Sequence, residues 1–380
     1  MTPIAPDMTP IAPEWYRIET VDQLDSPALV VYPLRVKANI ALAVEMAGDP
    51  ARLRPHIKTH KSPDVTRLLL EAGIHKFKCA TIAEAEMLAL AGATDILLAY
   101  QPVGPKLQRF ISLVRKYPAA KFSCLTDNEE ALKAMAAAFA SAGLHIAIYL
   151  DMNLGMDRTG IAPGAAAFQL YRTAASTDGV TPIGLHAYDG HIRDVDFDAR
   201  KQKCDEAFAS VTALKQALIQ AGLPSPVVVA GGSPTFSIHC NRPDVECSPG
   251  TFVYWDKGYS EGCPEQGFLP AALVVSRIIS LPAPGRLCLD LGHKSIAAEN
   301  ELSRRVSFLN APGWKAIGQS EEHLVVSAGE EHGHHPGDIV YGLPIHICPT
   351  VNLYERAYTV EEGRLTGEWK NTARDRKITV

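Results

Sequence analysis

Over the first two thirds of this chain, short apolar runs rich in β-branched residues alternate with longer helical stretches. Eight runs are expected to be strands: 28–32, 54–58, 76–80, 95–100, 121–125, 145–151, 182–188 and 227–231. The stretches between them include the expected helices 62–72, 82–91, 128–142 and 198–221, several of which are followed by a glycine suited to a helix C-terminus. Alternation of this kind predicts parallel strands joined by crossover helices.

Eight strands in this order favour a closed (β/α)8 barrel, a TIM barrel of the α/β class, over an open doubly wound sheet. No GxGxxG motif follows the first run, which argues against a dinucleotide-binding fold. From about residue 270 the pattern changes to strand-like segments with few helical stretches between them. We therefore predict a barrel over 25–268, a β-rich domain over 269–380, and an N-terminal segment, 1–24, that joins the β-rich domain.

Composition limits the class of partner. The 380 residues are 47% hydrophobic and 21% charged, with a net charge of −5, so nothing in the charge balance favours nucleic acid or an anionic membrane. The eight cysteines form no CxxC pair, the first residues carry no signal peptide, and no run is apolar enough to span a membrane. The repeated TPIAP at 2–6 and 9–13 indicates a duplicated start, with Met8 as an alternative initiator. We expect a cytoplasmic protein with reduced thiols that acts on a small molecule.

A lysine stands where the second expected strand ends, in the run RPHIKTHK. Active sites of such barrels lie at the carboxyl ends of the strands, and a lysine there is costly unless it is paired or used covalently. Lys58 is thus a candidate Schiff-base lysine. The alternative is that Lys58 and Lys61 are solvated loop charges, and composition alone favours that alternative.

Three later strand ends carry polar or glycine-rich runs: DMNLGMDRTG from 151, HAYDGH from 186 and AGGSPT from 230. Backbone N–H groups in a glycine-rich turn can hold a phosphate, and in this fold the loops after strands 7 and 8 are the usual phosphate site. The alternative for AGGSPT is a tight turn without a ligand. Its place after the last expected barrel strand favours the phosphate site.

The β-rich part contains HICPTVN, in which His346 and Cys348 would share one face of a strand. An imidazole and a thiolate suit Zn²⁺, and two protein ligands leave positions open, as in a catalytic site. A buried pair without a metal is the alternative. The run HGHH at 332–335 is a competing metal candidate, but a solvated loop is the preferred interpretation. The run EEH at 321–323 could support the metal ligands, contact the substrate or be an exposed charge run.

Six motifs recur in the order of a known family: RPHIKTHK, DxNxGMxRTG, GLHAYDGH, AGGSPT, SPGTFVYWD and HICPTVN. Together they resemble the D-threonine aldolase/D-serine dehydratase family, fold-type III pyridoxal 5′-phosphate enzymes with an alanine racemase-like barrel. The resemblance covers essentially the whole chain from about residue 15. It implies a barrel with a C-terminal β-domain, a homodimer, a D-amino acid substrate, and a divalent metal, Zn²⁺ or Mn²⁺, beside the cofactor.

The resemblance also assigns residue roles. Lys58 is similar to the cofactor-binding lysine, Arg158 to the arginine at the cofactor's phenolic oxygen, and Tyr188 to the tyrosine beside the ring. It places Gly231, Gly232 and Thr235 in the phosphate-binding turn and Tyr254 near the cofactor. It places His346 and Cys348 at the metal.

The motifs divide between two activities. His-x-Cys at the metal is typical of the dehydratases. The rest of the sequence, including KFKCATIAEAE and SEEHLVV, is more similar to the aldolase branch. We expect retro-aldol cleavage of D-3-hydroxy-amino acids such as D-threonine, with His191 as a candidate base, and keep a D-serine or D-3-hydroxyaspartate dehydratase as the alternative. A non-catalytic pyridoxal phosphate carrier would not need the His346/Cys348 segment, and no second acid/base for a racemase is evident.

Overall fold

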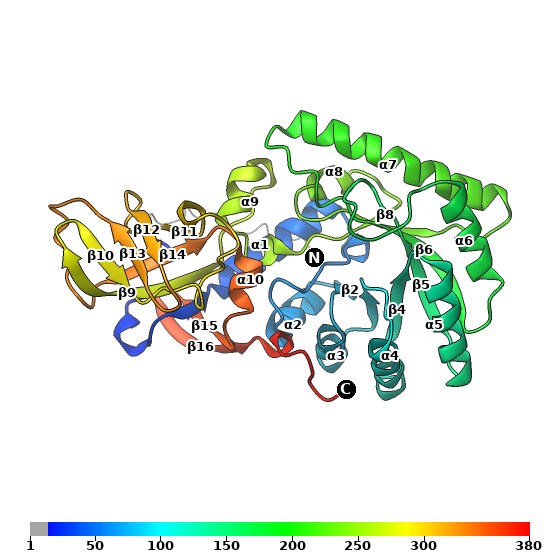
Figure 1. Ribbon diagram of the computed structural model, residues 1–380, viewed down its shortest axis with the longest axis horizontal. Coiled ribbons are helices and arrows are strands. Elements are labelled where there is room, and N and C mark those ends of the chain that lie inside the picture. The colour runs from blue at the N-terminus through cyan, green and yellow to red at the C-terminus, as the bar shows by residue number, and fades with distance from the viewer. Residues whose placement is uncertain (1–13) are drawn as a thin grey trace, which may run out of the picture. The chain divides into compact units, whose positions relative to one another are not determined.

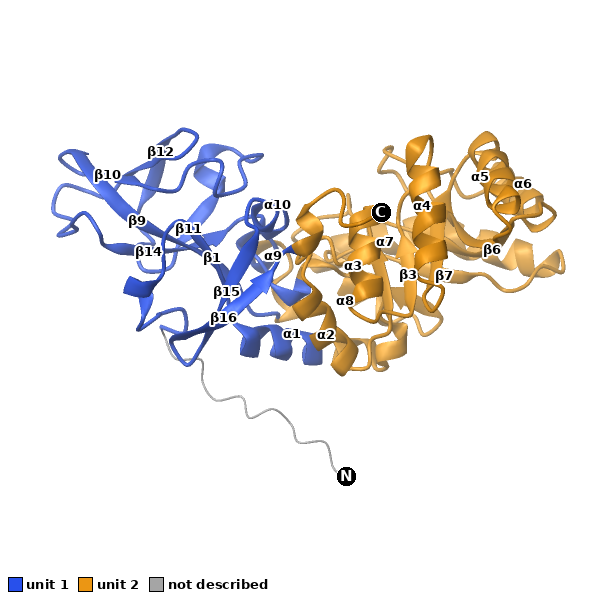
Figure 2. Cartoon of the chain, turned by 90° about the horizontal axis from the view of Figure 1, so that it is seen from below, with its two compact units in different colours: residues 1–42, 252–260, 268–371 blue, residues 43–251, 261–267, 372–380 orange. Residues whose placement is uncertain are grey.

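The computed structural model describes residues 14–380, so the repeated TPIAP segments lie outside the described residues (Figure 1). The chain divides into two compact units (Figure 2). Unit 1 comprises residues up to 42, 252–260 and 268–371; unit 2 comprises 43–251, 261–267 and 372–380. The two units therefore do not correspond to two consecutive stretches of sequence. The short segment 252–260 belongs to unit 1, the next segment, 261–267, belongs to unit 2, and the chain returns to unit 2 at 372–380.

Unit 2 is built on a parallel sheet whose strands follow one another in chain order. Its strands are β2 (Lys76–Cys79), β3 (Asp95–Leu98), β4 (Lys121–Thr126), β5 (Ile146–Asp151), β6 (Val180–Ala187), β7 (Val227–Ala230) and β8 (Val245–Cys247). Its helices are α2 (Pro63–Glu71), α3 (Ile82–Leu90), α4 (Pro105–Lys116), α5 (Glu129–Ser141), α6 (Ala165–Ala175), α7 (Phe197–Gln220) and α8 (Phe236–His239). Helices α3 to α6 line the outer side of this curled sheet (Figure 1).

The segment before α2 joins the two edges of this sheet. Leu53 forms a parallel bridge with Cys247 of β8, and His56 forms one with Lys78 of β2. The Arg54 N–H donates to the Cys247 carbonyl over 2.8 Å, and the Lys78 N–H donates to the Pro55 carbonyl over 2.9 Å. The expected run 54–58 thus fills the eighth place of the barrel by isolated bridges. The predicted fold class, an α/β barrel followed by a β-rich domain, is confirmed.

One expected barrel strand belongs elsewhere. The run 28–32 contains β1 (Ala28–Val31), which pairs antiparallel with β9 (Ala272–Ala283) and parallel with β15 (Arg356–Glu361) in unit 1. All four residues of β1 are buried, so the run has the continuous apolar character of a barrel strand. The strand that the sequence reading missed is β8, whose three residues include the charged Glu246.

Unit 1 is a β-unit with β9 and β1 at its centre. The main path of its sheet runs β12-β13-β10-β9-β1-β15-β16, while β14 pairs with both β9 and β11. The further strands are β10 (Arg286–Leu289), β11 (Val306–Phe308), β12 (Lys315–Gln319), β13 (Leu324–Ser327), β14 (Ile339–Pro344) and β16 (Arg364–Lys370). Tyr16 and Ile18, from the segment before β1, pack in the apolar core of this sheet with Leu273, Val275 and Tyr341. The described part of the N-terminal segment is therefore built into unit 1.

The remaining helices are short or, like α1 (Pro33–Ala47) and α9 (Lys257–Gly262), begin in unit 1 and end in unit 2. The others are α10 (Ile347–Val351) and the 3-10 turns Val21–Gln23, Pro50–Arg52, Thr251–Val253, Pro264–Gln266, Leu302–Arg304 and Thr372–Arg374. Ser62, Thr81 and Asn128 accept N–H groups at the starts of α2, α3 and α5. Within residues 14–380, no helix combines the length and apolarity needed to cross a membrane.

Candidate active site

Two lysines follow the barrel segment 53–57, and their surroundings differ. Lys61 Nζ lies 2.5 Å from Oε1 of the buried Glu84, so its charge is already neutralised. Lys58 Nζ has no hydrogen-bond or ion-pair partner in the described part of the chain and lies 6.0 Å from the centroid of the Tyr188 ring. Of the two lysines that the motif offers, Lys58 is the one with a free amine.

The Tyr188 ring is surrounded by cations. It follows β6, and besides Lys58 it faces Lys78 Nζ and Arg158 Cζ, each 5.4 Å from its centroid. A cavity of about 40 Å³ next to the ring is lined by residues that include Asp151, Arg158, His186 and Tyr188. The predicted residues Lys58, Tyr188 and Arg158 are thus brought together, and a third cation, Lys78, joins them.

Lys78 belongs to a buried chain of three groups inside the barrel. Its Nζ lies 3.3 Å from His186 Nε2, and His186 Nδ1 lies 2.7 Å from Asp151 Oδ1. Burial, followed by the charge of Lys58, lowers the pKa of Lys78 to about 7. Burial raises the pKa of Asp151, but the hydrogen bond and charge of His186, together with Thr159 and Lys78, outweigh burial and leave the pKa below its ordinary value. Asp151 is therefore an ionised carboxylate that holds the imidazole.

The glycine-rich turn after β7 is tightly enclosed. Gly231 has φ 78°, and a side chain on Gly232 would place its Cβ 2.9 Å from the Tyr188 ring. The Gly232 N–H donates to Thr235 Oγ1 over 3.3 Å, and the N–H of Thr251, after β8, donates to Ser233 Oγ over 3.0 Å. The loops after β7 and β8 are thereby tied together at the barrel end where Tyr188 lies.

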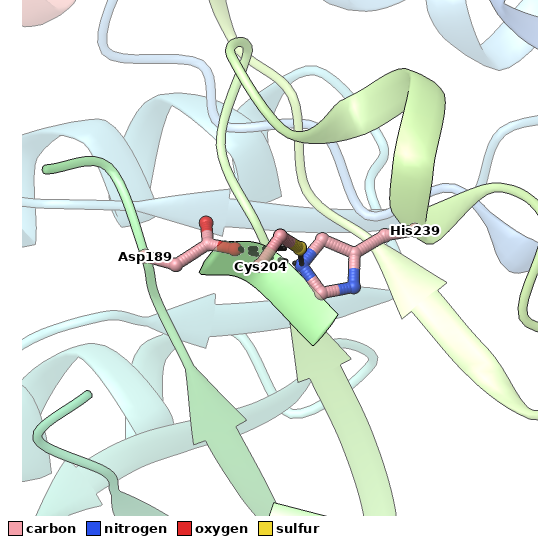
Figure 3. Close-up of side chains that lie close together, drawn as sticks. All are labelled: Asp189, Cys204 and His239. Atoms are coloured by element: carbon pink, nitrogen blue, oxygen red, sulfur yellow. Dashed lines mark hydrogen bonds and ion pairs between the residues drawn. The ribbon is translucent and has the colours of Figure 1, made fainter. Parts of the chain in front are cut away.

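Asp189, Cys204 and His239 form a second buried hydrogen-bond network beside this turn (Figure 3). Thr235 Oγ1 donates to Asp189 Oδ1 over 2.6 Å, and His239 Nε2 lies 2.8 Å from Asp189 Oδ2. Arg242 donates to His239 Nδ1, so Nδ1 carries no hydrogen and the proton must be on Nε2, where it is donated to Asp189. Asp189, which is next to Tyr188 in the chain, thus links the tyrosine loop to the phosphate-type turn.

The ligand atoms of Asp189, Cys204 and His239 lie within 4.8 Å of one another, a spacing that could hold a metal ion. Two observations argue against that use. His239 Nε2 carries a proton, and burial raises the pKa of Cys204 to about 12, so neither group is a ready ligand. We read this cluster as a hydrogen-bond network that supports the turn.

His191 lies in the loop that follows β6, three residues after Tyr188. It is exposed, and its Nε2 would lie 3.3 Å from a Cβ built on Gly155. Gly155 belongs to the DxNxGM loop after β5, where its N–H donates to Asn153 Oδ1 over 3.0 Å. An exposed imidazole at the strand ends can exchange protons with a bound ligand, as the prediction of a base requires.

In unit 1, the predicted metal ligands lie at the start of a short helix, which corrects the expectation of a strand. Strand β14 ends at Pro344, His346 occupies the N-cap position of α10 without a side-chain hydrogen bond to the helix, and Cys348 is in its first turn. Pro349 explains the difference, because it cannot donate to a strand ladder but costs nothing in a first helical turn. The two side chains are nevertheless hydrogen-bonded to each other.

Acidic groups surround this pair. His346 Nδ1 lies 2.6 Å from Glu299 Oε1, and the Ile347 N–H donates to Asp256 Oδ2 over 3.0 Å. Burial lowers the pKa of His346, but its hydrogen bond to Cys348 and the charges of Cys348, Asp256 and Glu299 raise it to about 9. Burial raises the pKa of Asp256 to about 6. Metal binding here would displace the proton of His346, and the nitrogen and sulfur donors that remain fit Zn²⁺.

The other residues of the sequence analysis fall outside these groups. Tyr254 is fully buried in unit 1, close in sequence to Asp256. The EEH run is an exposed charge run, because Glu321 pairs with Lys294 and both side chains are more than half exposed. The histidines at 332 and 334 stack on each other in a loop, with ring centroids 5.9 Å apart, and within the described residues they form no three-ligand group.

Sequence reasoning missed Lys78, Glu299 and Asp256, and gave no separate role to His186 and Asp151 inside their motifs. For Lys78 a signal was present. The run KFKC predicts a strand, and a lysine one residue before a buried strand end is as anomalous as Lys58. Glu299 is 47 positions from His346, and no local pattern links the two.

Comparisons with known proteins show the family of this chain. Residues 33–257 match the family model "Alanine racemase, N-terminal domain", and 271–360 match "Putative serine dehydratase domain". A D-threonine aldolase of Arthrobacter sp is 28% identical over 360 residues, 93% of each chain. A D-threo-3-hydroxyaspartate dehydratase of Delftia sp. (strain HT23) is 30% identical over 63% of each chain. The crystal structure of D-threonine aldolase from Filomicrobium marinum superposes with a TM-score of 0.85 at 26% identity, covering 92% of this chain and 95% of that one. Over most of its length, therefore, the chain is similar to lyases.

Proposed function

Because this chain belongs to the family defined by the alanine racemase N-terminal domain, we propose that it is a pyridoxal 5′-phosphate- and metal-dependent lyase of D-3-hydroxy-amino acids. The preferred reaction is retro-aldol cleavage, in which D-threonine gives glycine and acetaldehyde. One observation carries the proposal: the unpaired amine of Lys58 stands with Lys78 and Arg158 around the Tyr188 ring.

The barrel residues fit the cofactor by charge. Pyridoxal phosphate is an anion, and three cations border Tyr188, while Asp189 is already engaged by His239. Lys58 would hold the cofactor covalently, Arg158 would neutralise its ring oxygen, and the turn from Gly231 to Thr235, with Gly232, would receive its phosphate. The bound pyridoxal ring supplies an electron sink for negative charge at the substrate Cα.

The protein groups divide the remaining work. His191, exposed at the strand ends, would take the proton of the substrate's β-hydroxyl as the Cα–Cβ bond breaks. His346 and Cys348 would hold a divalent ion, Zn²⁺ or Mn²⁺, and the chemistry that such an ion supplies is the acidification of a hydroxyl group. Tyr254, placed near the cofactor by the family resemblance, completes the proposed residues. A homodimer and a cytoplasmic location also belong to this proposal, and light scattering and cell fractionation test them.

A second candidate is the dehydratase, and Cys348 is the observation that favours it. The family resemblance associates His-x-Cys with dehydratases, which convert D-serine or D-3-hydroxyaspartate into a 2-oxo acid and ammonia. In that reaction Lys58 would remove the Cα proton, and the metal would assist departure of the hydroxyl group.

Product analysis separates the two candidates. The enzyme loaded with cofactor and Zn²⁺ or Mn²⁺ is incubated in parallel with D-threonine and with D-serine. We expect equal amounts of glycine and acetaldehyde from D-threonine. A 2-oxo acid and ammonia without glycine would reject the aldolase in favour of the dehydratase, and neither set of products from either substrate would reject both.

A further inference from the structure

The proposed function uses one buried lysine of the barrel, Lys78, only for its charge. Lys78 is 2% exposed, and on β2 it is paired in register with Leu97, which belongs to the apolar cluster inside the barrel. An isolated ammonium would be costly at such a place. Its hydrogen-bond partner is the imidazole of His186, at 3.3 Å.

In the series Lys78–His186–Asp151, the direction of each hydrogen bond follows from the two end groups, Asp151 and Lys78. Asp151 is an ionised carboxylate and can only accept, so His186 Nδ1 carries the hydrogen that bridges 2.7 Å to Asp151 Oδ1. His186 Nε2 is then a lone pair that faces the Lys78 amine. This arrangement stabilises a proton on Lys78, as the carboxylate of a catalytic triad stabilises the charged state of the group that it supports.

Other charges oppose that proton. The titratable and charged groups that face Lys78 are Arg54, His56 and Lys58 from the closing segment, Asp151 of β5, His186 of β6, and Tyr188 and Asp189 of the following loop. Burial and Lys58 lower the pKa of Lys78 to about 7, while Asp151 and Asp189 act in the opposite direction. Near neutral pH the amine of Lys78 can therefore both accept and release a proton.

Lys58 is the group that needs such a neighbour. A lysine amine attacks a carbonyl only after it has lost its proton, and Lys58 has no acceptor of its own in the described residues. The amines of Lys58 and Lys78 face the same Tyr188 ring, at 6.0 and 5.4 Å from its centroid. Both amines therefore border one ring, and the transfer that we infer runs along this ring from Lys58 to Lys78.

We infer that Lys78 is the proton acceptor for Lys58, and that His186 and Asp151 hold the charge that results. In balanced form, the Lys58 ammonium and the neutral Lys78 amine become the neutral Lys58 amine and the Lys78 ammonium. The inference rests on the proposed function, because it gives Lys58 its carbonyl partner. Lys78 acts through Lys58 and does not act on the substrate.

The first experiment follows cofactor uptake. Cofactor-free protein is mixed with pyridoxal 5′-phosphate between pH 6 and pH 10, and the visible band of lysine-bound cofactor is recorded with time. We expect the uptake rate of the wild type to rise through pH about 7, following Lys78. In Lys78→Met the rate at neutral pH should fall about a hundredfold, the usual size of a lost acid–base group, and recover only in alkaline solution.

Lys78→Arg separates proton transfer from charge. A guanidinium keeps the positive charge but stays protonated, so this variant should be as slow as Lys78→Met. Lys76→Met is the matched control, because Lys76 lies on the same strand but pairs with Glu246, and it should behave as the wild type. Wild-type rates in Lys78→Met or in Lys78→Arg would overturn the inference.

The second experiment needs no cofactor. Competitive labelling with trace acetic anhydride, read by mass spectrometry, gives the pH at which the Lys78 amine titrates. We expect an inflection near pH 7, raised by about one unit in Lys58→Met, which removes a like charge. Asp151→Asn should lower the inflection, and it serves if substitutions at Lys78 impair folding. An inflection at the ordinary lysine value of 10.5 would overturn the inference. Absence of a visible band in the wild type would instead reject the proposed function, so the two failures are distinguishable.

Discussion

The two units hold two histidine-centred groups of opposite electrical character. In unit 2, His186 is buried between Asp151 and Lys78, and three cations face the Tyr188 ring beside it. In unit 1, His346 is half-exposed, with Cys348, Glu299 and Asp256 around it. Burial and a neighbouring lysine lower the pKa of His186, whereas neighbouring acids raise that of His346.

Because of this difference, the two regions of one chain suit ligands of opposite charge. The proposed function assigns an anion, pyridoxal phosphate, to the cation-rich barrel end and a divalent cation to the acid-rich cluster of unit 1. If each region acts on its own ligand, a substitution in one should leave the ligand of the other in place.

The largest expected effect comes from Lys58→Ala. Without the amine, the visible band of lysine-bound cofactor and the lyase activity should both fall to background, because Lys61 is paired with Glu84 and Lys78 is held by His186. Metal content, measured by atomic emission, should stay at the wild-type level. Lys61→Met should retain the band, since Lys61 is occupied by Glu84. A surviving band in Lys58→Ala would show that the lysine is misassigned.

Cys348→Ala tests the other side of the comparison. We expect metal content to fall and activity to drop about a hundredfold, with the visible band retained. A chelator should do the same to the wild type, and added Zn²⁺ or Mn²⁺ should restore activity there but not in the variant. Cys204→Ala is the matched control, because its thiol lies in the hydrogen-bond network around Asp189. Loss of metal in Cys204→Ala, with retention in Cys348→Ala, would reverse the assignment of the two clusters.

Acid should weaken the barrel through its buried histidines. Burial lowers the pKa of His60 to about 3, below the 6.5 of an unfolded histidine. The unfolded chain therefore binds a proton at His60 below pH 6.5, whereas the folded chain does so only near pH 3. The free energy of unfolding is unaffected above pH 6.5 and falls as the pH drops toward 3, by about 2 kcal/mol at pH 5. Urea unfolding at pH 7 and pH 5 should show a loss smaller by that amount in His60→Gln. The exposed His75→Gln serves as control, and an equal loss in both variants would show that the burial of His60 is not the cause.

The smallest effect concerns Glu299, the carboxylate beside His346. Glu299→Gln keeps a hydrogen-bond acceptor but removes a charge, and metal affinity should fall about tenfold, as is usual for the partner of a ligating histidine. Titration with a metal indicator measures this. Glu301→Gln, which changes a glutamate two residues away, should leave the affinity unchanged. Equal affinities in Glu299→Gln and the wild type would show that the carboxylate plays no part in metal binding.

The sequence predicts the barrel well because its signals are local. Alternating apolar runs and helix caps such as Ser62 and Thr81 depend on neighbouring residues. Strand β1 was assigned to the wrong sheet, because a strand buried on both faces reads the same in either one. The short β8 carries too few residues for a pattern, and α10 depends on the backbone restriction at Pro349.

The candidate site divides in the same way. Lys58 and the glycine turn stand at strand ends, where the fold itself directs attention to them. The link from Lys78 to His186 spans 108 positions, and that from Glu299 to His346 spans 47. Such partners meet only when the chain is folded, so the charge of each region could not be predicted from the motifs alone.

Reduction of the cofactor-loaded protein with borohydride tests the central claim most directly. The reagent makes the lysine–cofactor bond permanent, and peptide mass spectrometry then locates the modified residue. We expect the added pyridoxyl mass on Lys58, with Lys61 and Lys78 unmodified. Modification of Lys61 or Lys78 in place of Lys58 would contradict the assignment.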